Sequence, residues 1–202
     1  MSGHVEPMTP DDIFTLVELH SVYLNYGSGI MPHFVPVLED TENICLKYVA
    51  RNGEMGGLIV YVKGISLSGG HPEICRRITE MTGGAPAYTC DAVLLDRKYR
   101  GGGASSLLYG RAREELLRKG AEYVLHELWV WPDGTTPARR LPETFGETVD
   151  LGLFRNFYRN FDHYGYLCPI CKGKCVCSAR LCLSRCGRVR ENEHGKKELK
   201  KN

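Results

Sequence analysis

Three consecutive glycines, Gly101 to Gly103, stand where a buried strand gives way to an amphipathic helix. The strand pattern is YTCDAVLL, and the helical pattern is YGRAREELLRKG. The first N–H groups of a helix have no partner within it, and the helix dipole places partial positive charge there. Glycine lets the backbone approach an anion closely, and Lys98 and Arg100 add positive charge. The sequence therefore predicts an anion site at this turn.

Two common phosphate-binding motifs do not fit the glycine turn. The run GGGASS lacks the GxGxxG spacing of a dinucleotide-binding turn, and no Gly-Lys-Ser/Thr follows as it would in a P-loop. The alternative is a flexible surface turn that merely starts a helix. The two flanking basic residues favour the anion site.

Six of the nine cysteines fall within LCPICKGKCVCSARLCLSRCGR, and they are Cys168, Cys171, Cys175, Cys177, Cys182 and Cys186. A Cys-x-x-Cys pair followed by Lys-Gly lets two thiolates hold one ion, with the glycine freeing the turn. Since no matching histidine is near, we expect structural zinc, one or two ions, held by Cys168, Cys171 and a further pair. An iron–sulfur cluster, disulfides or free thiols are the alternatives.

The stretch from LLDRKYRGGGASS to YVLHELWV resembles the coenzyme A-binding core of the GNAT acetyltransferase superfamily. That family's motif, Arg/Gln-x-x-Gly-x-Gly/Ala, corresponds to Arg100-Gly101-Gly102-Gly103-Ala104-Ser105. The hairpin around Asn52-Gly53 resembles the family's preceding hairpin, and FRNFYRNFDHYGY resembles its last helix. The resemblance covers residues 8 to 167, approximately. It implies that the amides from Gly101 to Ser105 hold the pyrophosphate of acetyl-CoA, and that the Leu95 backbone pairs with the pantetheine arm.

The sequence departs from the family pattern at three places. Ser105 stands where Gly or Ala is usual, and Arg97 stands where Pro is common. Counting back from Gly165-Tyr166 puts Phe161 at the position of the family's acid. Tyr158 lies one helical turn earlier, and we expect it to protonate the leaving thiolate, unless it is only a packed aromatic residue.

Transfer of an acetyl group to an amine requires a group that takes the amine's proton. Alternation along YTCDAVLL predicts Asp91 on one face with Val93 and Leu95. Alternation along YVLHELWV predicts Glu127 on one face and His126 on the other. Asp91 and Glu127 are the candidate bases, and His126 is a weaker one. Each has the alternative of being a paired structural group.

The elements that position these residues alternate between helix and strand, which predicts an α/β (α+β) fold with one mixed sheet flanked by helices. A hairpin is expected over ICLKYVARNGEMGGLIVYVKGI, and GSGIMPHFVP is loop-like. The remaining expected elements are helices at 11–26, 71–81, 104–119 and 151–161, strands at 87–95 and 122–130, and a long loop at 131–149.

The charge of the chain is distributed unevenly. The net charge of all 202 residues is +2, yet residues 168–202 hold ten Lys and Arg against three Asp and Glu. We expect an acetyltransferase domain over 1–167, a Cys-rich metal-binding segment over 168–187, and a basic, disordered tail over 188–202. Basic residues between the cysteines suit RNA or another polyanion.

These features support two functions. The first is an acetyl-CoA-dependent N-acetyltransferase with an unidentified primary amine as acceptor. The second is a catalytically weak GNAT-like module that binds RNA or protein through a zinc-dependent basic tail. The sequence lacks an 18-residue apolar run and a secretory pattern at its N-terminus, which predicts a cytoplasmic protein without a membrane span.

Overall fold

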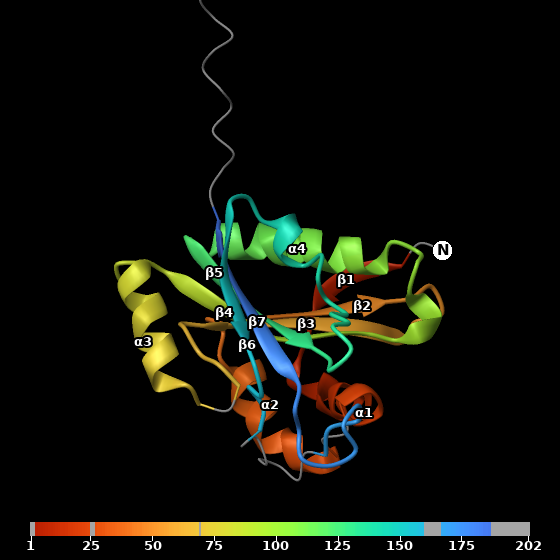
Figure 1. Ribbon diagram of the computed structural model, residues 1–202. Helices are drawn as coiled ribbons and strands as arrows, with labels where there is room; N and C mark the ends of the chain where they lie inside the picture. Colours follow the sequence, from red (N-terminus) through yellow and green to blue (C-terminus); the bar gives the residue numbers. More distant parts are fainter. Residues whose placement is uncertain (1–2, 25–26, 69, 160–166, 187–202) are drawn as a thin grey trace, which may run out of the picture.

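The computed structural model describes residues 3–24, 27–68, 70–159 and 167–186 (Figure 1). The predictions for Phe161, for Gly165-Tyr166 and for the tail at 188–202 lie outside these ranges. Within the described ranges, no helix is long and apolar enough to cross a bilayer.

One sheet of seven strands forms the centre of the molecule, in the order β1-β2-β3-β4-β5-β7-β6. Only β4 and β5 run parallel, and every other neighbouring pair is antiparallel. The sheet is therefore mixed, as predicted. The strands are β1 (His4–Pro7), β2 (Ile44–Val49), β3 (Met55–Lys63), β4 (Ala87–Leu95), β5 (Tyr123–Val130), β6 (Thr148–Phe154) and β7 (Ser178–Arg185).

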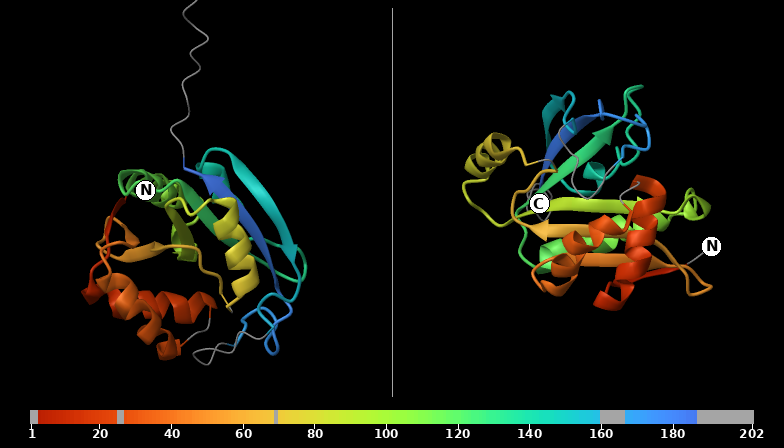
Figure 2. Two further views of the ribbon diagram at one scale, coloured as in Figure 1. Left: turned by 90° about the vertical axis from the view of Figure 1, so that its left-hand side faces the viewer. Right: turned by 90° about the horizontal axis from the view of Figure 1, so that it is seen from below.

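Within the part of the chain that the structure describes, four α-helices pack around this sheet (Figures 1 and 2). The helix α4 covers one face, and α1 and α2 lie together on the other. The helix α3 packs through Ile74 and Ile78 beside the β5–β7–β6 end of the sheet. Their bounds are α1 (Ile13–Leu24), α2 (Met31–Glu39), α3 (Pro72–Met81) and α4 (Ala104–Arg118).

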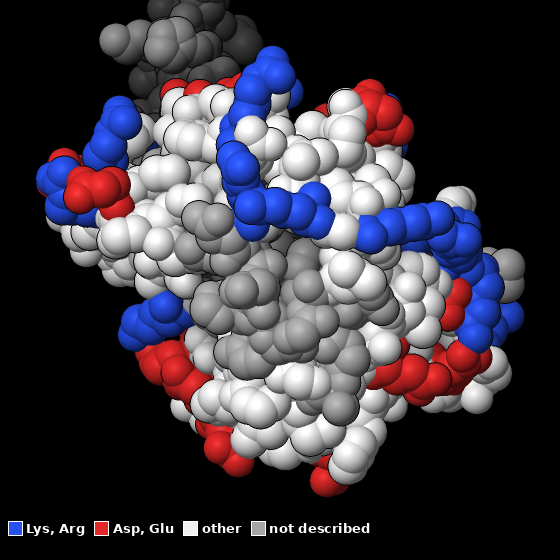
Figure 3. Space-filling model, turned by 60° about the horizontal axis from the view of Figure 1, so that its bottom comes forward, with Lys and Arg blue, Asp and Glu red and all other residues white. Residues whose placement is uncertain are grey.

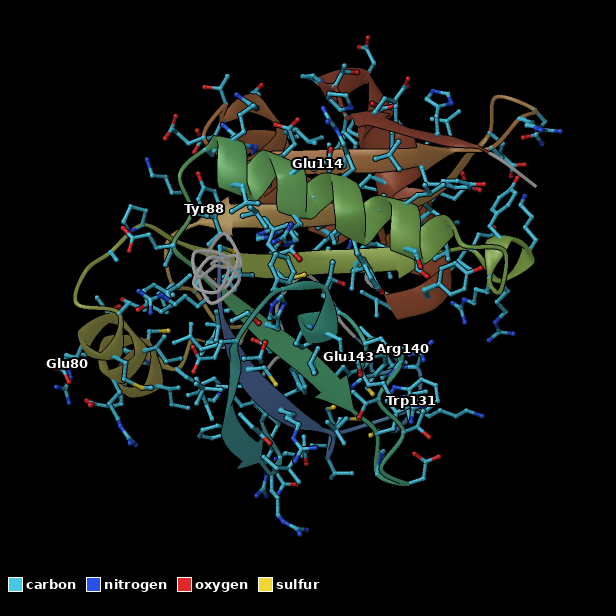
Figure 4. All side chains as sticks on the ribbon, turned by 90° about the horizontal axis from the view of Figure 1, so that it is seen from above. Glu80, Tyr88, Glu114, Trp131, Arg140 and Glu143 are labelled. Carbon is cyan, nitrogen blue, oxygen red and sulfur yellow. The ribbon has the colours of Figure 1, made fainter. Side chains whose placement is uncertain are left out.

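The parallel pair separates halfway along its length. Its last paired residues are Cys90 on β4 and His126 on β5. Beyond them β4 stays paired with β3 as far as Leu95, and β5 stays paired with β7 as far as Val130. The two strands therefore diverge toward their carboxyl ends, and Figure 4 shows β5 turning away from β4 and from α4.

Most elements predicted from the sequence are confirmed. The hairpin of β2 and β3 turns at Asn52-Gly53, where Gly53 has a φ of 81°. The strand β4 has its predicted bounds, and α1, α3, α4 and β5 agree with their predictions to within two residues.

The helix predicted over 151–161 is wrong. Residues Thr148–Phe154 form strand β6 at the edge of the sheet, and turns follow as far as residue 159. Val149, Leu151 and Leu153 alternate with period two, which suits a strand. Gly152 has a φ of 110°, which no helix accommodates, and it lies at a break in the register with β7.

Three further elements differ from their predictions. The loop expected at GSGIMPHFVP becomes α2, in which Pro32 occupies the first turn and Pro36 lies inside the helix. The strand β1 was not predicted. The second half of the Cys-rich segment is strand β7, which lies inside the sheet between β5 and β6.

Candidate functional site

The glycine turn joins β4 to α4 with backbone angles that favour glycine. Gly101 and Gly103 have φ values of 78° and 86°. The first backbone hydrogen bond into α4 runs from the N–H of Leu107 to the oxygen of Gly103, at 3.1 Å. The N–H groups at the start of the helix are thus left for other acceptors. A Cβ added at any of the three glycines would meet no atom within 4 Å, so the open turn is not explained by packing within the protein.

The two basic residues beside the turn are engaged within the protein. Lys98 forms an ion pair with Glu54. The Nε of Arg100 donates to the backbone oxygen of Leu95 at 3.0 Å, and its guanidinium lies over the ring of Tyr23, 5.3 Å from the centroid. Lys98 and Arg100 therefore brace the turn, and the backbone amides are its exposed donors.

A pocket of about 300 Å³ lies against this turn, which is the size of a small ligand site. Its lining combines aromatic rings, basic side chains and glycine backbone, and consists of Tyr48, Lys98, Tyr99, Arg100, Gly101 and Gly102. The underside of the molecule also carries a band of Lys and Arg side chains, with Asp and Glu along its margin (Figure 3). Both features suit a ligand with negative charge.

Asp91 lies just beyond the point where β4 and β5 separate. Its register with β3 skips from Cys90 to Ala92, which marks a bulge at Asp91. The Nε2 of His33, on α2, lies 2.9 Å from the Asp91 carboxylate, and this contact raises the pKa of His33.

The bulge changes the face on which Asp91 lies. Val93 and Leu95 pack toward α4, whereas Asp91 contacts α2 on the opposite face. The prediction that the three residues share one face is therefore wrong, because period-two alternation does not continue through a bulge.

Glu127 lies directly after the last β4–β5 pair, on the other side of the gap. One carboxylate oxygen accepts the N–H of Ser68 at 2.8 Å. Burial raises the pKa of Glu127 to about 7, the hydrogen bonds from Ser68 and Tyr158 oppose that rise, and the charge of Asp91 adds to it. The adjacent His126 faces the other way and packs against Tyr61 and Phe145, as alternation predicts.

Tyr158 is buried in a turn after β6, not on a helix. Its side chain reaches Glu127, whose pKa its hydrogen bond lowers. The ring also contacts Phe157, with centroids 5.1 Å apart. The structure thus brings the candidate acid and one candidate base together, although the helix expected to carry the acid is absent from this segment.

Four of the six clustered cysteines gather their sulfur atoms at one point. The Sγ atoms of Cys168, Cys171, Cys175 and Cys177 all lie within 4.8 Å of one another. Cys177 Sγ lies 3.9 Å from that of Cys168 and 3.6 Å from that of Cys171. Four sulfurs at about 2.3 Å from a tetrahedral zinc are separated by about 3.8 Å. The spacing matches this geometry, so the cluster could hold a metal ion.

Backbone amides orient these sulfurs. The N–H of Cys171 points to Cys168 Sγ at 3.4 Å, and the N–H of Val176 points to Cys171 Sγ at 3.5 Å. The positive φ of the turn, 53°, falls on Lys172 rather than on the glycine after it. Such amide contacts favour thiolates, as expected around a bound cation.

Cys182 and Cys186 lie apart from this cluster. Cys182 is within β7, where it pairs with His126 on one side and Asp150 on the other. Cys186 directly follows β7 and packs toward the α4 side of the sheet. Among the six cysteines proposed from the sequence, the structure brings together only the first four.

Sequence reasoning missed three residues around the carboxylates. His33 lay in a segment read as a loop, and Ser68 acts through its backbone, which leaves no sequence signal. Trp129 lies in the run YVLHELWV but was not proposed as a site residue, and its buried indole nitrogen lies beside Cys177. Its period-two spacing from Glu127 on β5 was the available signal.

No family model matches the chain, and no curated protein matches it in sequence. Solved structures do match it in three dimensions. Arabidopsis thaliana NAA60 in complex with acetyl-CoA has a TM-score of 0.63 and 14% identity, covering 91% of this chain and 98% of that one. The Escherichia coli ribosomal-protein-S18-alanine N-acetyltransferase has a TM-score of 0.59 and 14% identity, covering 95% and 98%. The chain has the GNAT fold.

A third GNAT structure shows the breadth of this likeness. The aminoglycoside 6′-acetyltransferase type Ii has a TM-score of 0.59 and 10% identity, covering 91% of this chain and 97% of that one. Two of the three proteins are named for different acceptors, a ribosomal-protein alanine and an aminoglycoside, so the shared fold leaves the substrate of this chain open.

Proposed function

We propose that the protein transfers an acetyl group from acetyl-CoA to a primary amine. The observation that carries this proposal is the placement of Glu127 beside the gap between β4 and β5, while the open glycine turn ends β4. A binding site for an anion and a carboxyl able to accept a proton are thus held by the same pair of strands.

The glycine turn suits the pyrophosphate of acetyl-CoA. Gly101, Gly102 and Gly103 are exposed, with open space where a side chain would stand, so a phosphate could approach their backbone and the start of α4 without displacing a side chain. The backbone of Leu95, at the free edge that β4 gains where β5 leaves it, would pair with the pantetheine arm. Arg100 already donates a hydrogen bond to the Leu95 oxygen. The pantetheine arm would therefore pair with other backbone N–H and C=O groups at this end of β4, or Arg100 would have to move.

Glu127 and Tyr158 would handle the protons of the reaction. A carboxyl with a pKa of about 7 can take the proton of an ammonium near neutral pH, which frees the nitrogen lone pair. The nitrogen then forms a bond to the acetyl carbon as the carbon–sulfur bond breaks, and Tyr158 gives its proton to the sulfur. The acetylated nitrogen releases its surplus proton to water and becomes the neutral amide. The Tyr158 oxygen recovers a proton from Glu127 through their hydrogen bond, so both residues return to their starting forms.

The two carboxylates near the gap favour a cationic acceptor. Asp91 and Glu127 lie close enough for the charge of one to raise the pKa of the other. An ammonium group would relieve that repulsion. The loop that follows β5, with Trp131, Arg140 and Glu143 at that end of the strand (Figure 4), is the segment we propose to shape the acceptor site.

We further propose zinc as a structural ion held by Cys168, Cys171, Cys175 and Cys177. Four thiolates close the tetrahedron and leave no position for a reactive water. The division into residues 1–167, 168–187 and 188–202, the cytoplasmic location, and the binding of RNA or protein by the tail stay predictions. So does the alternative of a catalytically weak module, which the internal engagement of Lys98 and Arg100 favours.

Isothermal titration with acetyl-CoA tests the binding half of this proposal. We expect saturable binding of one molecule per chain, with desulfo-CoA as a ligand that keeps the phosphates but lacks the thioester. Absence of binding for both ligands would exclude an acetyl-CoA-dependent enzyme.

A further inference from the structure

The four-cysteine cluster, defined by Cys168, Cys171, Cys175 and Cys177, shares its buried surroundings with the candidate acid. Tyr158 belongs to the same buried group of side chains as three of these cysteines. The glycine turn leads into α4, and the first residue of that helix, Ala104, belongs to a different buried group of side chains, the one between α4 and the sheet. If the cysteine side chains shift, the side chains around Tyr158 should shift first and the glycine turn should not, because displacements pass through close-packed neighbours.

Trp129 links the four-cysteine cluster to Glu127. The two residues lie on one face of β5, since they are two positions apart. The Nε1 of Trp129 is buried, and the sulfur of Cys177 is the acceptor within its reach. A metal-bound thiolate is a stronger acceptor for this N–H than a thiol. Metal binding would thus strengthen the contact of this buried donor with Cys177 and fix the indole next to Glu127.

The turn that holds Tyr158 has little regular structure of its own. It follows β6, and Asn156 within it has a φ of 54°. Phe157 is held by His71, whose ring centroid lies 3.9 Å away. Side-chain packing, and not a helix or strand, therefore sets the position of Tyr158, so the buried surroundings that it shares with the cysteines matter for its geometry.

We propose that a metal ion bound by the four-cysteine cluster positions Tyr158 and Trp129 around Glu127, and that its loss disables acetyl transfer while leaving acetyl-CoA binding in place. The metal is a positioning ion that touches neither substrate. This inference rests on the proposed function.

Metal exchange on the full-length, untagged chain tests this inference. Trp129 emission is measured in the Trp131→Phe background, which leaves Trp129 as the sole tryptophan because the chain has two, and acetyl-CoA affinity and thiol release are measured on the chain with Trp131 in place. Zinc is removed with a chelator and replaced by zinc or by Co²⁺, whose thiolate charge-transfer bands report the sulfur ligands. We measure Trp129 emission, acetyl-CoA affinity, and thiol release from acetyl-CoA with an amine panel.

We expect metal removal to shift Trp129 emission and to lower thiol release at least tenfold, while the acetyl-CoA dissociation constant changes less than twofold. Zinc should restore both signals, and Co²⁺ should quench Trp129. The matched variants are Cys171→Ala and Cys186→Ala, since both residues are half-buried but only Cys171 is in the cluster. Cys171→Ala should behave as the metal-free protein and Cys186→Ala as the wild type.

The possible failures are distinguishable. A zinc-loaded protein that does not bind acetyl-CoA refutes the proposed function. Metal removal that abolishes acetyl-CoA binding together with thiol release would show that the ion supports the whole fold, which contradicts a positioning role. Trp129 emission that is insensitive to a demonstrably bound metal overturns the inference, whether or not an acceptor in the panel is used.

Discussion

Glu127 is the residue on which the proposed chemistry depends. Its side chain is half-buried beside the strand gap, and its pKa of about 7 lies well above the ordinary value of 4.5. Such a group is a poor structural choice, because burying its charged form costs stability. It is a good base near neutral pH. Groups whose altered pKa lowers stability but suits catalysis are typical of active sites.

Glu127→Gln should lower the rate of acetyl transfer by about a hundredfold to ten-thousandfold. In the wild type, kcat/KM should rise with pH through about 7 as the carboxyl loses its proton. Steady-state kinetics between pH 5.5 and pH 9, with Glu122→Gln as the exposed control, measure both effects. A wild-type profile without a step near pH 7 would assign the base to another group.

The Glu127→Gln variant should also change how the free energy of unfolding depends on pH. Folded Glu127 holds its proton up to about pH 7, whereas the unfolded residue loses it near 4.5. The free energy of unfolding of the wild type should therefore fall across this window. Glu127→Gln removes that fall, so the variant should be more stable above pH 7, by at most about 3 kcal/mol. Urea unfolding at pH 5 and pH 8 decides this.

Tyr158→Phe should lower turnover by about tenfold to a thousandfold without weakening acetyl-CoA binding, because only the proton donor is removed. Tyr123→Phe, on β5 but outside the candidate site, is the control. An unchanged rate for Tyr158→Phe would assign protonation of the thiolate to another residue or to water.

At the scale of elements, the strand–turn–helix unit of β4, the glycines and α4 is where sequence and structure agree best. Its apolar residues recur at clear strand and helix spacings, and its three glycines mark the turn between the strand and the helix. The bulge at Asp91 and the strand β6 could not be predicted, for different reasons. A bulge depends on the partner strand. The strand β6 is a short edge strand whose Val149 and Leu153 are about half exposed, so its period-two pattern is too short to be told from the start of a helix.

Gly103→Glu should abolish acetyl-CoA binding, since a side chain and a negative charge would enter the phosphate cradle. Gly64→Glu is the matched control. Gly64 also has a positive φ, 98°, and open space around it, but it lies at the opposite end of β3 and β4. Titration calorimetry with both variants separates backbone strain from loss of the anion site. Equal acetyl-CoA affinity for Gly103→Glu and the wild type would place the cofactor elsewhere.

At the scale of the whole molecule, the four-cysteine cluster and the sheet are continuous. Its last cysteine, Cys177, immediately precedes β7, which completes the sheet between β5 and β6. Cysteine spacing predicted a cluster in this segment, but it did not tell the four clustered residues from Cys182 and Cys186. Which cysteines cluster depends on where β7 begins, because the residues within the strand are held in the sheet. The sequence of this short, cysteine-rich segment does not show where the strand begins.

Chelation of the metal should lower the melting temperature by about 5 °C or more, because an ion that binds only the folded chain stabilises it by mass action. Metal analysis should find one zinc per chain before chelation and none after it. If zinc is removed and the melting temperature does not change, β7 stays paired in the sheet without help from the metal.

The central claim is that this fold catalyses acetyl transfer to an amine, and labelled acetyl-CoA tests it most directly. The zinc-loaded protein is incubated with ¹³C-acetyl-CoA and a panel of polyamines, lysine-containing peptides and peptides with free N-termini, and products are identified by mass spectrometry. We expect a labelled acetyl group on the nitrogen of at least one acceptor, formed in proportion to released coenzyme A and lost in Glu127→Gln. Labelled product that forms equally with Glu127→Gln, or acetyl-CoA that binds but is never consumed, would contradict the account.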